Sequence, residues 1–271
     1  MSTPTPVPAR DFLFLPLPGL GARHLIERNI LVYKRIWMVI VSGAFEPLFY
    51  LLSLGFGLGA IVGDVTLANG QTVPYAAFVA PAMMATAAMN GAIVESTFNI
   101  FFKLHFEKTY DGILSTPMGV ADVAIGEIGW ALMRGTAYAI GFYVVMLLLG
   151  LVESAWSILS IPAAVLIGFA FSACGMAATT YMKKIQDFDL IALVQVPLFL
   201  FSATFFPITT YPPVLQAIVA VTPLYQGIFL IRSLTVGDVG PQLLIPVAYL
   251  CAMGAIGLAI CSRRLDLLLR K

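Results

Sequence analysis

The sequence predicts an all-α membrane protein that crosses the bilayer several times. Hydrophobic residues make up 60% of the 271-residue chain and charged residues only 11%, and the mean hydropathy is +0.94. Two long segments, Val65–Val94 and Leu190–Ile231, contain no Asp, Glu, Lys or Arg. A soluble domain carries about 25% charged residues. The composition therefore excludes a soluble globular domain and indicates a polytopic membrane protein.

The first predicted elements are a proline-rich arm and an amphipathic helix. Residues 1–19 contain five prolines, so we expect an irregular arm, on the cytoplasmic side. In residues 20–37 one helical face is apolar, and the basic side chains fall away from it. The apolar residues are Ile26, Ile30, Tyr33 and Trp37, and the basic ones are Arg23, Arg28, Lys34 and Arg35. This pattern predicts a helix in the membrane interface; an ordinary first turn of the next helix is the alternative.

Six segments are apolar enough to cross the hydrocarbon core, which takes about 20 helical residues. They are residues 38–62, 76–101, 130–152, 156–182, 190–207 and 241–262. After the fifth, four prolines divide the apolar sequence into pieces too short to span. Because unpaired backbone groups are not tolerated in lipid, we expect residues 208–236 to form a re-entrant or surface-lying hairpin between spans five and six. Residues 20–271 thus form a single transmembrane domain.

Basic residues lie almost entirely on one side of this predicted topology. Fourteen of the fifteen Lys and Arg residues fall in the N-terminal segment, near the loops after the second and fourth spans, or in the tail. Arg232, in the predicted hairpin, is the exception. Since loops rich in Lys and Arg stay in the cytoplasm, both termini are expected to be cytoplasmic and the hairpin extracellular.

Two carboxylates lie inside predicted spans, Glu46 in the first and Glu95 in the second. An ionised group at the bilayer centre costs about 2.5–3.5 kcal/mol on insertion scales, so each requires a polar partner. Asn99 follows Glu95 by one helical turn and is the expected local partner. Two interpretations stay open for these carboxylates: a structural contact with a neighbouring helix or the backbone, or a direct part in a transport path.

The first span also contains three glycines at a spacing of four residues, Gly55, Gly59 and Gly63. Helices in lipid associate through close backbone contact, so such a series predicts a packing face. The partner helix is expected either in the same chain or in a second copy.

The stretch from Lys103 to Ile125 is too polar to span, yet its pattern is not that of a loose linker. Residues 109–114 can form a short helix that Thr116-Pro117 ends, because the residue before proline avoids helical backbone angles. A second helix can start at Asp122 and lead into the third span. A short helix tied to two spans is suited to act as a lever for a soluble partner; a simple intracellular turn is the alternative.

Together these residues resemble the permease subunits of type-2 ATP-binding-cassette (ABC) exporters, in particular the branch that exports nodulation lipo-oligosaccharides and the related drug-export permeases. The similar elements run in order across residues 28–262, and their combination is specific to the family but not to a substrate. They are Glu46-Pro47-Leu48, Phe78–Pro81 through Met89-Asn90, Glu95–Phe98, Lys108–Pro117, Gly126-Glu127, Phe201–Pro207 and Thr222–Tyr225.

The resemblance implies a particular assembly in the cytoplasmic membrane of a bacterium. Two permease copies, expected to be identical, would dimerise among membrane lipids and bind two copies of a separate ABC ATPase. That ATPase would bind ATP and magnesium, because the chain has no GxxxxGK[ST] loop. Residues 103–118 would be the coupling helix, and the loop Lys183–Asp189 a second contact. The expected ATPase-coupling residues are Glu107, Lys108, Thr109, Tyr110, Leu114, Thr116, Pro117, Lys183 and Asp187.

Closure of the ATPase subunits would then move spans one, two and five and alternately expose a path at the permease dimer interface. The expected lining residues are Glu46, Met83, Glu95, Asn99, Phe201, Phe205 and Phe206. Such a wall suits an amphiphile or a lipid-linked glycan better than a small ion. For the aromatic residues, ordinary lipid contact or helix packing is the alternative.

Other function classes agree less well with the sequence. An ion-coupled secondary transporter would need ionisable residues at matched depths in two halves, and residues 136–262 offer no second pair. A membrane-embedded histidine catalyst or a multi-histidine metal site is excluded, because His24 and His105 are the only histidines and both lie outside the apolar segments. An intramembrane enzyme of another kind agrees still less well, since no nucleophile constellation lies at depth. A non-transport membrane scaffold that partners an ATPase stays open, and no nucleic acid, cofactor or metal is expected in this chain.

Overall fold

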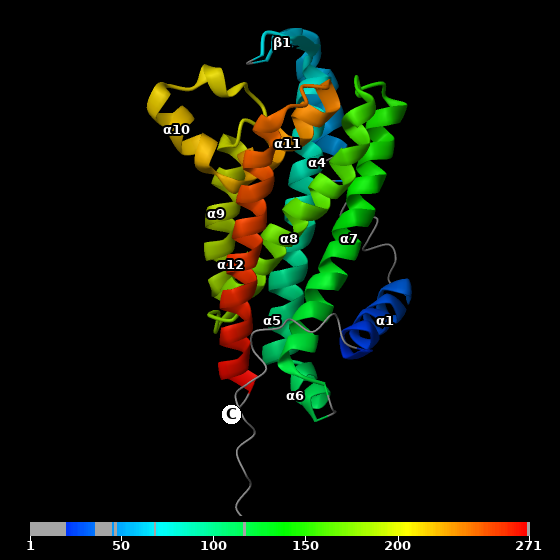
Figure 1. Cartoon of the computed structure of the whole chain (residues 1–271), viewed down its shortest axis with the longest axis vertical. Helices are drawn as coiled ribbons and strands as arrows, with labels where there is room; N and C mark the ends of the chain where they lie inside the picture. The colour runs from blue at the N-terminus through cyan, green and yellow to red at the C-terminus, as the bar shows by residue number, and fades with distance from the viewer. Residues whose placement is uncertain (1–19, 36–44, 46–47, 68, 116–117, 270–271) are drawn as a thin grey trace, which may run out of the picture.

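The computed structural model describes residues 20–35, 45, 48–67, 69–115 and 118–269. It is an upright bundle of long helices, with short elements at both ends (Figure 1). The arm 1–19, the predicted path residue Glu46, the coupling residues Thr116 and Pro117, and most of the first half of the predicted first span lie outside the described residues.

A continuous helical run from Tyr75 to His105 forms the centre of the bundle. It consists of α4 (Tyr75–Val94), a π-helical turn η2 (Glu95–Asn99) and α5 (Ile100–His105). Almost every residue of α4 is buried, because α7, α8, α11 and η1 pack around it. Its many alanines allow this close approach on all sides.

Three further helices are long and apolar enough to cross a membrane, and they match the predicted third, fourth and sixth spans. They are α7 (Val120–Leu148), α8 (Ser160–Thr179) preceded by η3 (Ala155–Leu159), and α12 (Leu244–Leu269) preceded by η6 (Pro241–Leu243). The expected separate helix at Asp122 is the first part of α7. The Asp122 carboxylate accepts a hydrogen bond from the Gly119 N–H (3.1 Å), so the helix begins there rather than at residue 130.

The predicted first and fifth spans correspond to shorter helical segments among the described residues. The first is helical over Leu48–Val62, as a turn at residues 48–50, a π-helix η1 (Leu51–Leu58) and α3 (Gly59–Val62). The fifth, α9 (Phe188–Phe201), ends six residues earlier than predicted. Beyond it Ala203 adopts a positive φ of 55°, which ends helical geometry.

The region predicted as a hairpin contains two helices that meet at a sharp bend. A short turn η5 (Ile208–Thr210) leads to α10 (Pro213–Val221) and then α11 (Pro223–Val236), and the two helices are bent by 86°. Pro223 opens α11, where its missing N–H removes no helical hydrogen bond. Helix α11 packs against α4, α8 and α12, so it belongs to the bundle rather than to its surface.

The short elements divide between the two ends of the bundle. The antiparallel strands β1 (Asp64–Thr66) and β2 (Thr72–Pro74), with Val65 paired to Val73, lie at the upper end with α10 (Figure 1). The short helix α6 (Thr109–Leu114), with the bounds predicted for it, and the end of α12 lie at the lower end.

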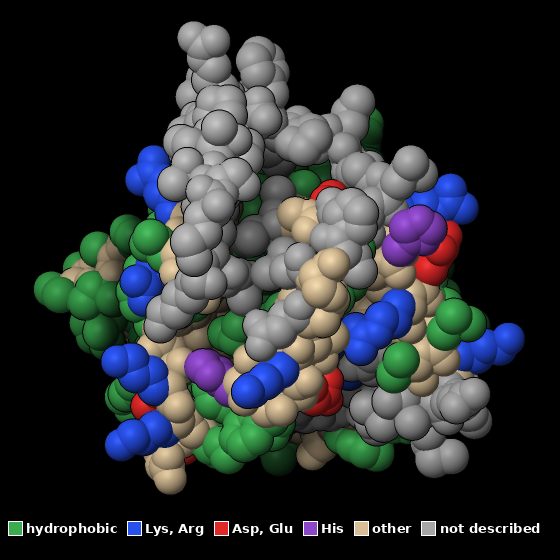
Figure 2. Space-filling view, turned by 90° about the horizontal axis from the view of Figure 1, so that it is seen from below, with side chains coloured by type: hydrophobic (Ala, Val, Ile, Leu, Met, Phe, Trp, Pro, Cys, Tyr) green, Lys and Arg blue, Asp and Glu red, His purple; other side chains and the backbone are tan. Residues whose placement is uncertain are grey.

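The lower end also bears most of the exposed basic side chains. Lys, Arg and His side chains are spread over the face seen from below in Figure 2. Among the described residues, the exposed Lys and Arg side chains of the lower half are Arg23, Arg28, Lys34, Lys108, Lys183, Lys184 and Arg263.

The N-terminal helix α1 (Leu20–Arg35) packs against α7. Its buried residues are Ala22, Leu25 and Asn29, whereas Ile30 is exposed. Gly126 allows this contact, because a Cβ there would lie 2.9 Å from the Leu25 side chain. Helix contact therefore uses a neighbouring stripe, and the predicted apolar stripe stays partly uncovered.

Two of the three glycines of the first span lie against the start of α4 in the same chain. A Cβ on Gly55 would lie 3.6 Å from the Ala76 Cα, and one on Gly59 would lie 3.6 Å from the Tyr75 side chain. Gly63 makes no such contact in the described part of the chain, where no atom beyond its chain neighbours lies within 4 Å of its Cβ position, so a packing role for it against a second copy stays a prediction. Its positive φ of +74°, which glycine adopts readily, marks the end of α3.

Candidate functional site

The centre of the bundle contains a buried ion pair between Glu95 of η2 and Arg134 of α7. The Glu95 carboxylate also accepts hydrogen bonds from the Asn99 amide and from the Trp130 indole N–H (2.8 Å). Arg134 in turn donates from Nε to the Tyr138 hydroxyl (2.8 Å). The side chains of Glu95 and Arg134 are only 2% and 9% exposed. This cluster lies at a π-helical turn, a feature that is frequent at functional sites.

These contacts favour the structural interpretation of Glu95 over a place in an open path. The predicted pairing with Asn99 is present, since one helical turn separates the two residues. Arg134 was missed as a partner, because it was assigned to the cytoplasmic end of the third span by its charge alone. A basic residue inside an apolar helix is a signal that sequence reasoning could have used, since such a charge requires a counter-ion.

A second buried ion pair joins the same two helical runs closer to the lower end. Lys103 Nζ of α5 lies 2.8 and 2.9 Å from the two carboxylate oxygens of Glu127 in α7. Asn29 of α1 is placed between them, donating to Glu127 (3.5 Å) and accepting from Lys103 (3.4 Å). The side chains of Lys103 and Glu127 are 8% and 1% exposed. The pair therefore connects α1, α5 and α7 inside the protein.

Tyr110 of α6, the helix predicted to couple to the ATPase, points into this region rather than toward the surface. The residue is 1% exposed and packs in an apolar cluster with Leu25 of α1, Val123 of α7 and Leu265 of α12. Burial, and next the nearby Glu127 carboxylate, raise the pKa of Tyr110 well above its usual range. Tyr110, expected among the ATPase-coupling residues, is therefore not part of the exposed surface of α6. Its ring instead attaches α6 to the bundle.

Most of the remaining predicted coupling residues lie in two loops of the lower end. Glu107, Lys108 and Thr109 lie at the start of α6, where Glu107 accepts a hydrogen bond from the Thr109 hydroxyl (3.1 Å). In the connection between α8 and α9, Asp187 accepts backbone N–H bonds from Lys183 (2.7 Å) and Lys184 (3.0 Å). These backbone bonds lower the pKa of Asp187 and fix the turn η4 (Ile185–Asp187).

Aromatic and backbone contacts hold the two loops near each other. His105 of α5 lies 3.2 Å from the Met182 carbonyl oxygen at the end of α8. Phe188, the first residue of α9, stacks on Phe98 with ring centres 4.0 Å apart and meets Phe101 edge-on at 5.1 Å. The predicted coupling residues of both loops are thus at the same end of the molecule (Figure 1). Leu114, also predicted as a coupling residue, is the last residue of α6.

A cavity of about 370 Å³ lies between α4 and α9, beside Tyr50 of the predicted first span. Met83 and Thr86 border it on the α4 side, and Phe199 on the α9 side. A hydrogen bond between the amides of Gln195 and Asn90 (2.8 Å) crosses the gap between the two helices. Mixed apolar and amide walls of this kind can accommodate both parts of an amphiphile.

The structure does not bring the predicted path residues together. Met83 borders the cavity, while Glu95 and Asn99 belong to the ion-pair cluster. Phe201 and Phe206 are about half exposed, at 49% and 51%. Phe205 packs edge-on against Phe199, with ring centres 5.2 Å apart. Sequence reasoning missed the cavity residues Tyr50, Thr86, Gln195 and Phe199, because only the packing of α9 against α4 selects them.

The bundle, with four described helices long and apolar enough to cross a membrane, defines a polytopic membrane protein. The sequence profile described as "ABC-2 type transporter" matches residues 22–236. The chain therefore belongs to the ABC-2 type transporter family, and it is a transmembrane permease of an ABC exporter. Members of this family are the membrane subunits of ABC transporters and are not themselves the catalytic subunits.

Curated relatives cover nearly the whole chain. Nodulation protein J of Rhizobium leguminosarum bv. viciae is 30% identical over 88% of this chain and 90% of its own length. Nodulation protein J of Rhizobium meliloti (strain 1021) is 29% identical over 93% of this chain and 96% of its own length. The chain is also 26% identical to the "Probable doxorubicin resistance ABC transporter permease protein DrrC" of Mycobacterium tuberculosis (strain CDC 1551 / Oshkosh), over 90% of this chain and 89% of that one.

We predict strong energetic coupling between Glu95 and Arg134. Glu95→Gln or Arg134→Met alone should each destabilise the protein by about 3–5 kcal/mol, because each removes one charge of a buried pair. The double variant should be destabilised by clearly less than the sum of the two single effects. Thermal unfolding of the four purified proteins measures this difference. Simple additivity would show that the two charges do not depend on each other.

Proposed function

We propose that this permease exports an amphiphilic or lipid-linked substrate, such as a lipo-oligosaccharide, a glycan or a drug, across the cytoplasmic membrane of a bacterium. It would act as a homodimer with two copies of a separate ABC ATPase, which would bind ATP and magnesium. The relatives support this class of substrate, since one is named for doxorubicin resistance and others for nodulation.

The cavity between α4 and α9 is the observation that carries this proposal. Helix α9 has few close contacts with the bundle, and the Asn90–Gln195 hydrogen bond is one of the few polar links to it. Its outer face presents apolar side chains such as Leu190 and Leu193, which are 64% and 68% exposed. A helix that is held loosely beside a cavity can move without breaking the packed core. We infer that α9 moves relative to α4 and that the second permease copy faces this side.

The lower end supports a role in ATPase coupling. Its exposed charges just before α6 and in the α8–α9 connection, Glu107, Lys108, Lys183 and Lys184, suit the polar rim of a protein interface. The buried ring of Tyr110 would transmit a push on α6 to α1, α7 and α12, because it belongs to one apolar cluster with residues of all three. Thr116 and Pro117 keep their proposed place in the coupling segment. No observation favours proton coupling instead, as both described buried carboxylates, Glu95 and Glu127, are paired with basic side chains.

We also propose the full topology expected from the sequence, with six spans, an interfacial α1, cytoplasmic termini and α10–α11 as an extracellular re-entrant hairpin. The separation of the loops into two ends supports it. The segments expected outside, β1–β2 and α10, lie at the end opposite to α6 and the end of α12 (Figure 1).

Side-specific labelling tests this topology. In a chain whose native cysteines are replaced by alanine, Asn69→Cys in the β1–β2 loop should react with a membrane-impermeant maleimide added to whole cells. Ser115→Cys after α6 should react only after the cells are opened. Both positions are exposed, so access to the correct side of the membrane decides the result. The reversed pattern would contradict the proposed orientation.

Two kinds of variant separate internal packing from partner contact at the lower end. Tyr110→Ala should lower the melting temperature of the permease alone, since loss of a buried aromatic ring costs about 3–5 kcal/mol. The double variant Lys183→Glu, Lys184→Glu should keep the melting temperature, because both side chains are exposed, but reduce the ATPase that co-purifies with the permease. An unchanged ATPase yield in the charge-reversal variant would exclude the α8–α9 connection as a contact.

A matched pair of tryptophan variants tests the cavity as part of the substrate path. Ala192→Trp places a large ring in the cavity, whereas Ala252→Trp places it on an exposed position of α12. We expect Ala192→Trp to slow ATP-dependent transport at least fivefold and Ala252→Trp to leave it near the wild-type rate. The measurement is ATP-driven movement of doxorubicin and of a fluorescent lipid in proteoliposomes that contain the permease with its co-purified ATPase.

The wild-type complex provides the control for the substrate class. If it hydrolyses ATP but moves neither probe, an amphiphilic cargo of this kind is excluded. If Ala192→Trp and Ala252→Trp transport equally fast, the cavity is not on the path. Light scattering of the purified complex gives its mass, and a mass that does not correspond to two permease and two ATPase subunits would contradict the proposed assembly.

A further inference from the structure

Arg232 of α11 is the one basic residue that the described part of the chain places at the upper end of the bundle. Its Nε donates to the Phe78 carbonyl of α4 (3.2 Å), and its Nη2 donates to the Ala203 carbonyl after α9 (3.0 Å). The centre of its guanidinium lies 3.9 Å from the centre of the Phe78 ring. Arg232 thus joins three elements of the fold around one positive charge.

This charge has no acidic counterpart among the described residues. No carboxylate of the described chain lies within 4.0 Å of the guanidinium nitrogens. A guanidinium carries five N–H groups, and the two carbonyls use two of them. A charged group away from bulk water is costly unless hydrogen bonds or an opposite charge compensate it. Three N–H groups of Arg232 therefore remain for another acceptor.

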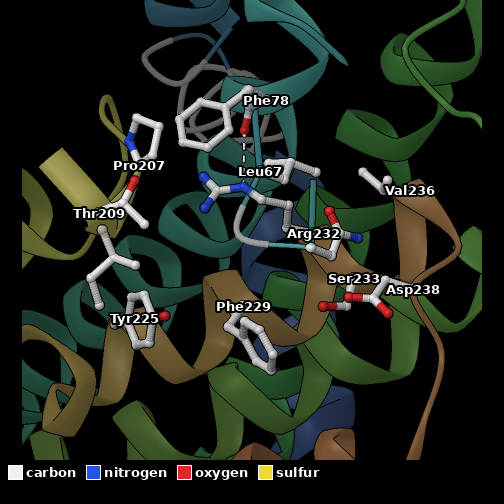
Figure 3. Close-up of a pocket in the computed structure, with 12 residues that line it drawn as sticks. Leu67, Phe78, Pro207, Thr209, Tyr225, Phe229, Arg232, Ser233, Val236 and Asp238 are labelled. Carbon is white, nitrogen blue, oxygen red and sulfur yellow. Dashed lines mark hydrogen bonds between the residues drawn. The ribbon is translucent and has the colours of Figure 1, made fainter. Parts of the chain in front are cut away.

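These N–H groups face a pocket of about 90 Å³ (Figure 3). Figure 3 shows the guanidinium extending toward Pro207 and Thr209, with Tyr225 on the same side. Thr209 and Tyr225 are among the residues that line the pocket, and their hydroxyls make no hydrogen bond to a described residue, so both can donate. The volume is far below the 300–1,000 Å³ of pockets for drug-sized ligands, and it suits a small head group instead.

One acidic residue also lines the pocket. Asp238 lies near Ser233, on the side away from the guanidinium in Figure 3, and accepts a long hydrogen bond from Gln242 (3.4 Å). Its charge repels an anion in the pocket but does not neutralise Arg232 directly. Asp238 would therefore weaken anion binding without preventing it.

We propose that this outer pocket binds a phosphate group, carried on the head of an amphiphile. Arginine is suited to phosphate because its planar N–H groups can donate two parallel bonds to two phosphate oxygens. The apolar residues Ile208 and Phe229 line the same pocket and offer contact to the adjoining part of such a molecule. Only the description of this end as outer rests on the proposed topology, and phosphate binding itself does not depend on transport.

Cysteine protection measures binding to the pocket directly. In the full chain, purified in a maltoside detergent with the native cysteines replaced by alanine, Ile208→Cys supplies one thiol in the pocket wall. Its reaction rate with neutral N-ethylmaleimide is measured with dihexanoylphosphatidic acid, with dihexanoylglycerol of the same chain length, and with inorganic phosphate. We expect phosphatidic acid to slow the reaction at least threefold and the uncharged diacylglycerol to leave it unchanged.

Two variants test the charges that define the pocket. Arg232→Gln should abolish the protection by phosphatidic acid, whereas Asp238→Asn should lower the concentration that gives half of the protection. Asp238→Asn keeps Arg232 and its two carbonyl contacts, so it tests the site even if Arg232→Gln fails to fold. Equal protection by inorganic phosphate assigns the site to the free ion, and protection by phosphatidic acid alone assigns it to an amphiphile head.

The proposal is overturned if neither phosphate compound protects the thiol, or if the diacylglycerol protects as well as phosphatidic acid. It is also overturned if folded Arg232→Gln and Asp238→Asn both respond like the parent chain. Because the assay contains no ATPase and no transport step, its failure would leave the export function itself untouched.

Discussion

Two buried ion pairs fix the arrangement of the bundle, because both connect the same two helical runs. Glu95 and Lys103 lie on the run from α4 to α5, and Arg134 and Glu127 lie on α7. The two runs are antiparallel. In one pair the acid, Glu95, lies on the α4–α5 run, whereas in the other pair the base, Lys103, lies on that run. Sliding one run past the other would bring like charges together, so the pairs specify the register as well as the contact.

This register positions elements that carry no charge themselves. The close fit of α1 on α7 depends on Gly126, next to Glu127, and Asn29 of α1 completes the lower ion pair. The apolar cluster around Tyr110 lies beside the same pair and includes residues of α1, α7, α8 and α12. The lower end of the bundle is consequently one packed unit, and α6 is attached to it by the Tyr110 ring.

Helix α9 contrasts with this unit. Within α9, the amide pair Asn90–Gln195 is one of the few described polar links to the bundle. Just beyond its end, the Ala203 carbonyl accepts from Arg232 (3.0 Å) and the Phe205 carbonyl accepts from the Tyr75 hydroxyl (3.1 Å). Aromatic contacts at Phe188 and Phe199 hold its two ends, and a cavity remains along its middle. In the proposed function, the packed core would carry the coupling segment, and the loosely held helix beside the cavity would gate the export path. The pocket at Arg232 lies where the end of α9, the start of α4 and α11 meet.

The sequence by itself determined the class of the protein and the position of most helices. Charge-free segments of twenty or more residues allow little but membrane helices, and four predicted spans match helices of spanning length. Proline and capping patterns gave α6 its bounds, and the spacing of Glu95 and Asn99 gave their contact, because these signals act within a few residues.

Only the tertiary structure decided which residues separated along the chain meet. Arg134 lies 39 residues from Glu95 and Glu127 lies 24 residues from Lys103, so no local spacing reveals either ion pair. The inward direction of Tyr110 follows from the docking of α6 under α1, α7 and α12 rather than from its helical face. The cavity residues and the surroundings of Arg232 likewise depend on how α9 and α11 pack against α4. Helical periodicity determines which face a side chain occupies, but the fold determines what that face contacts.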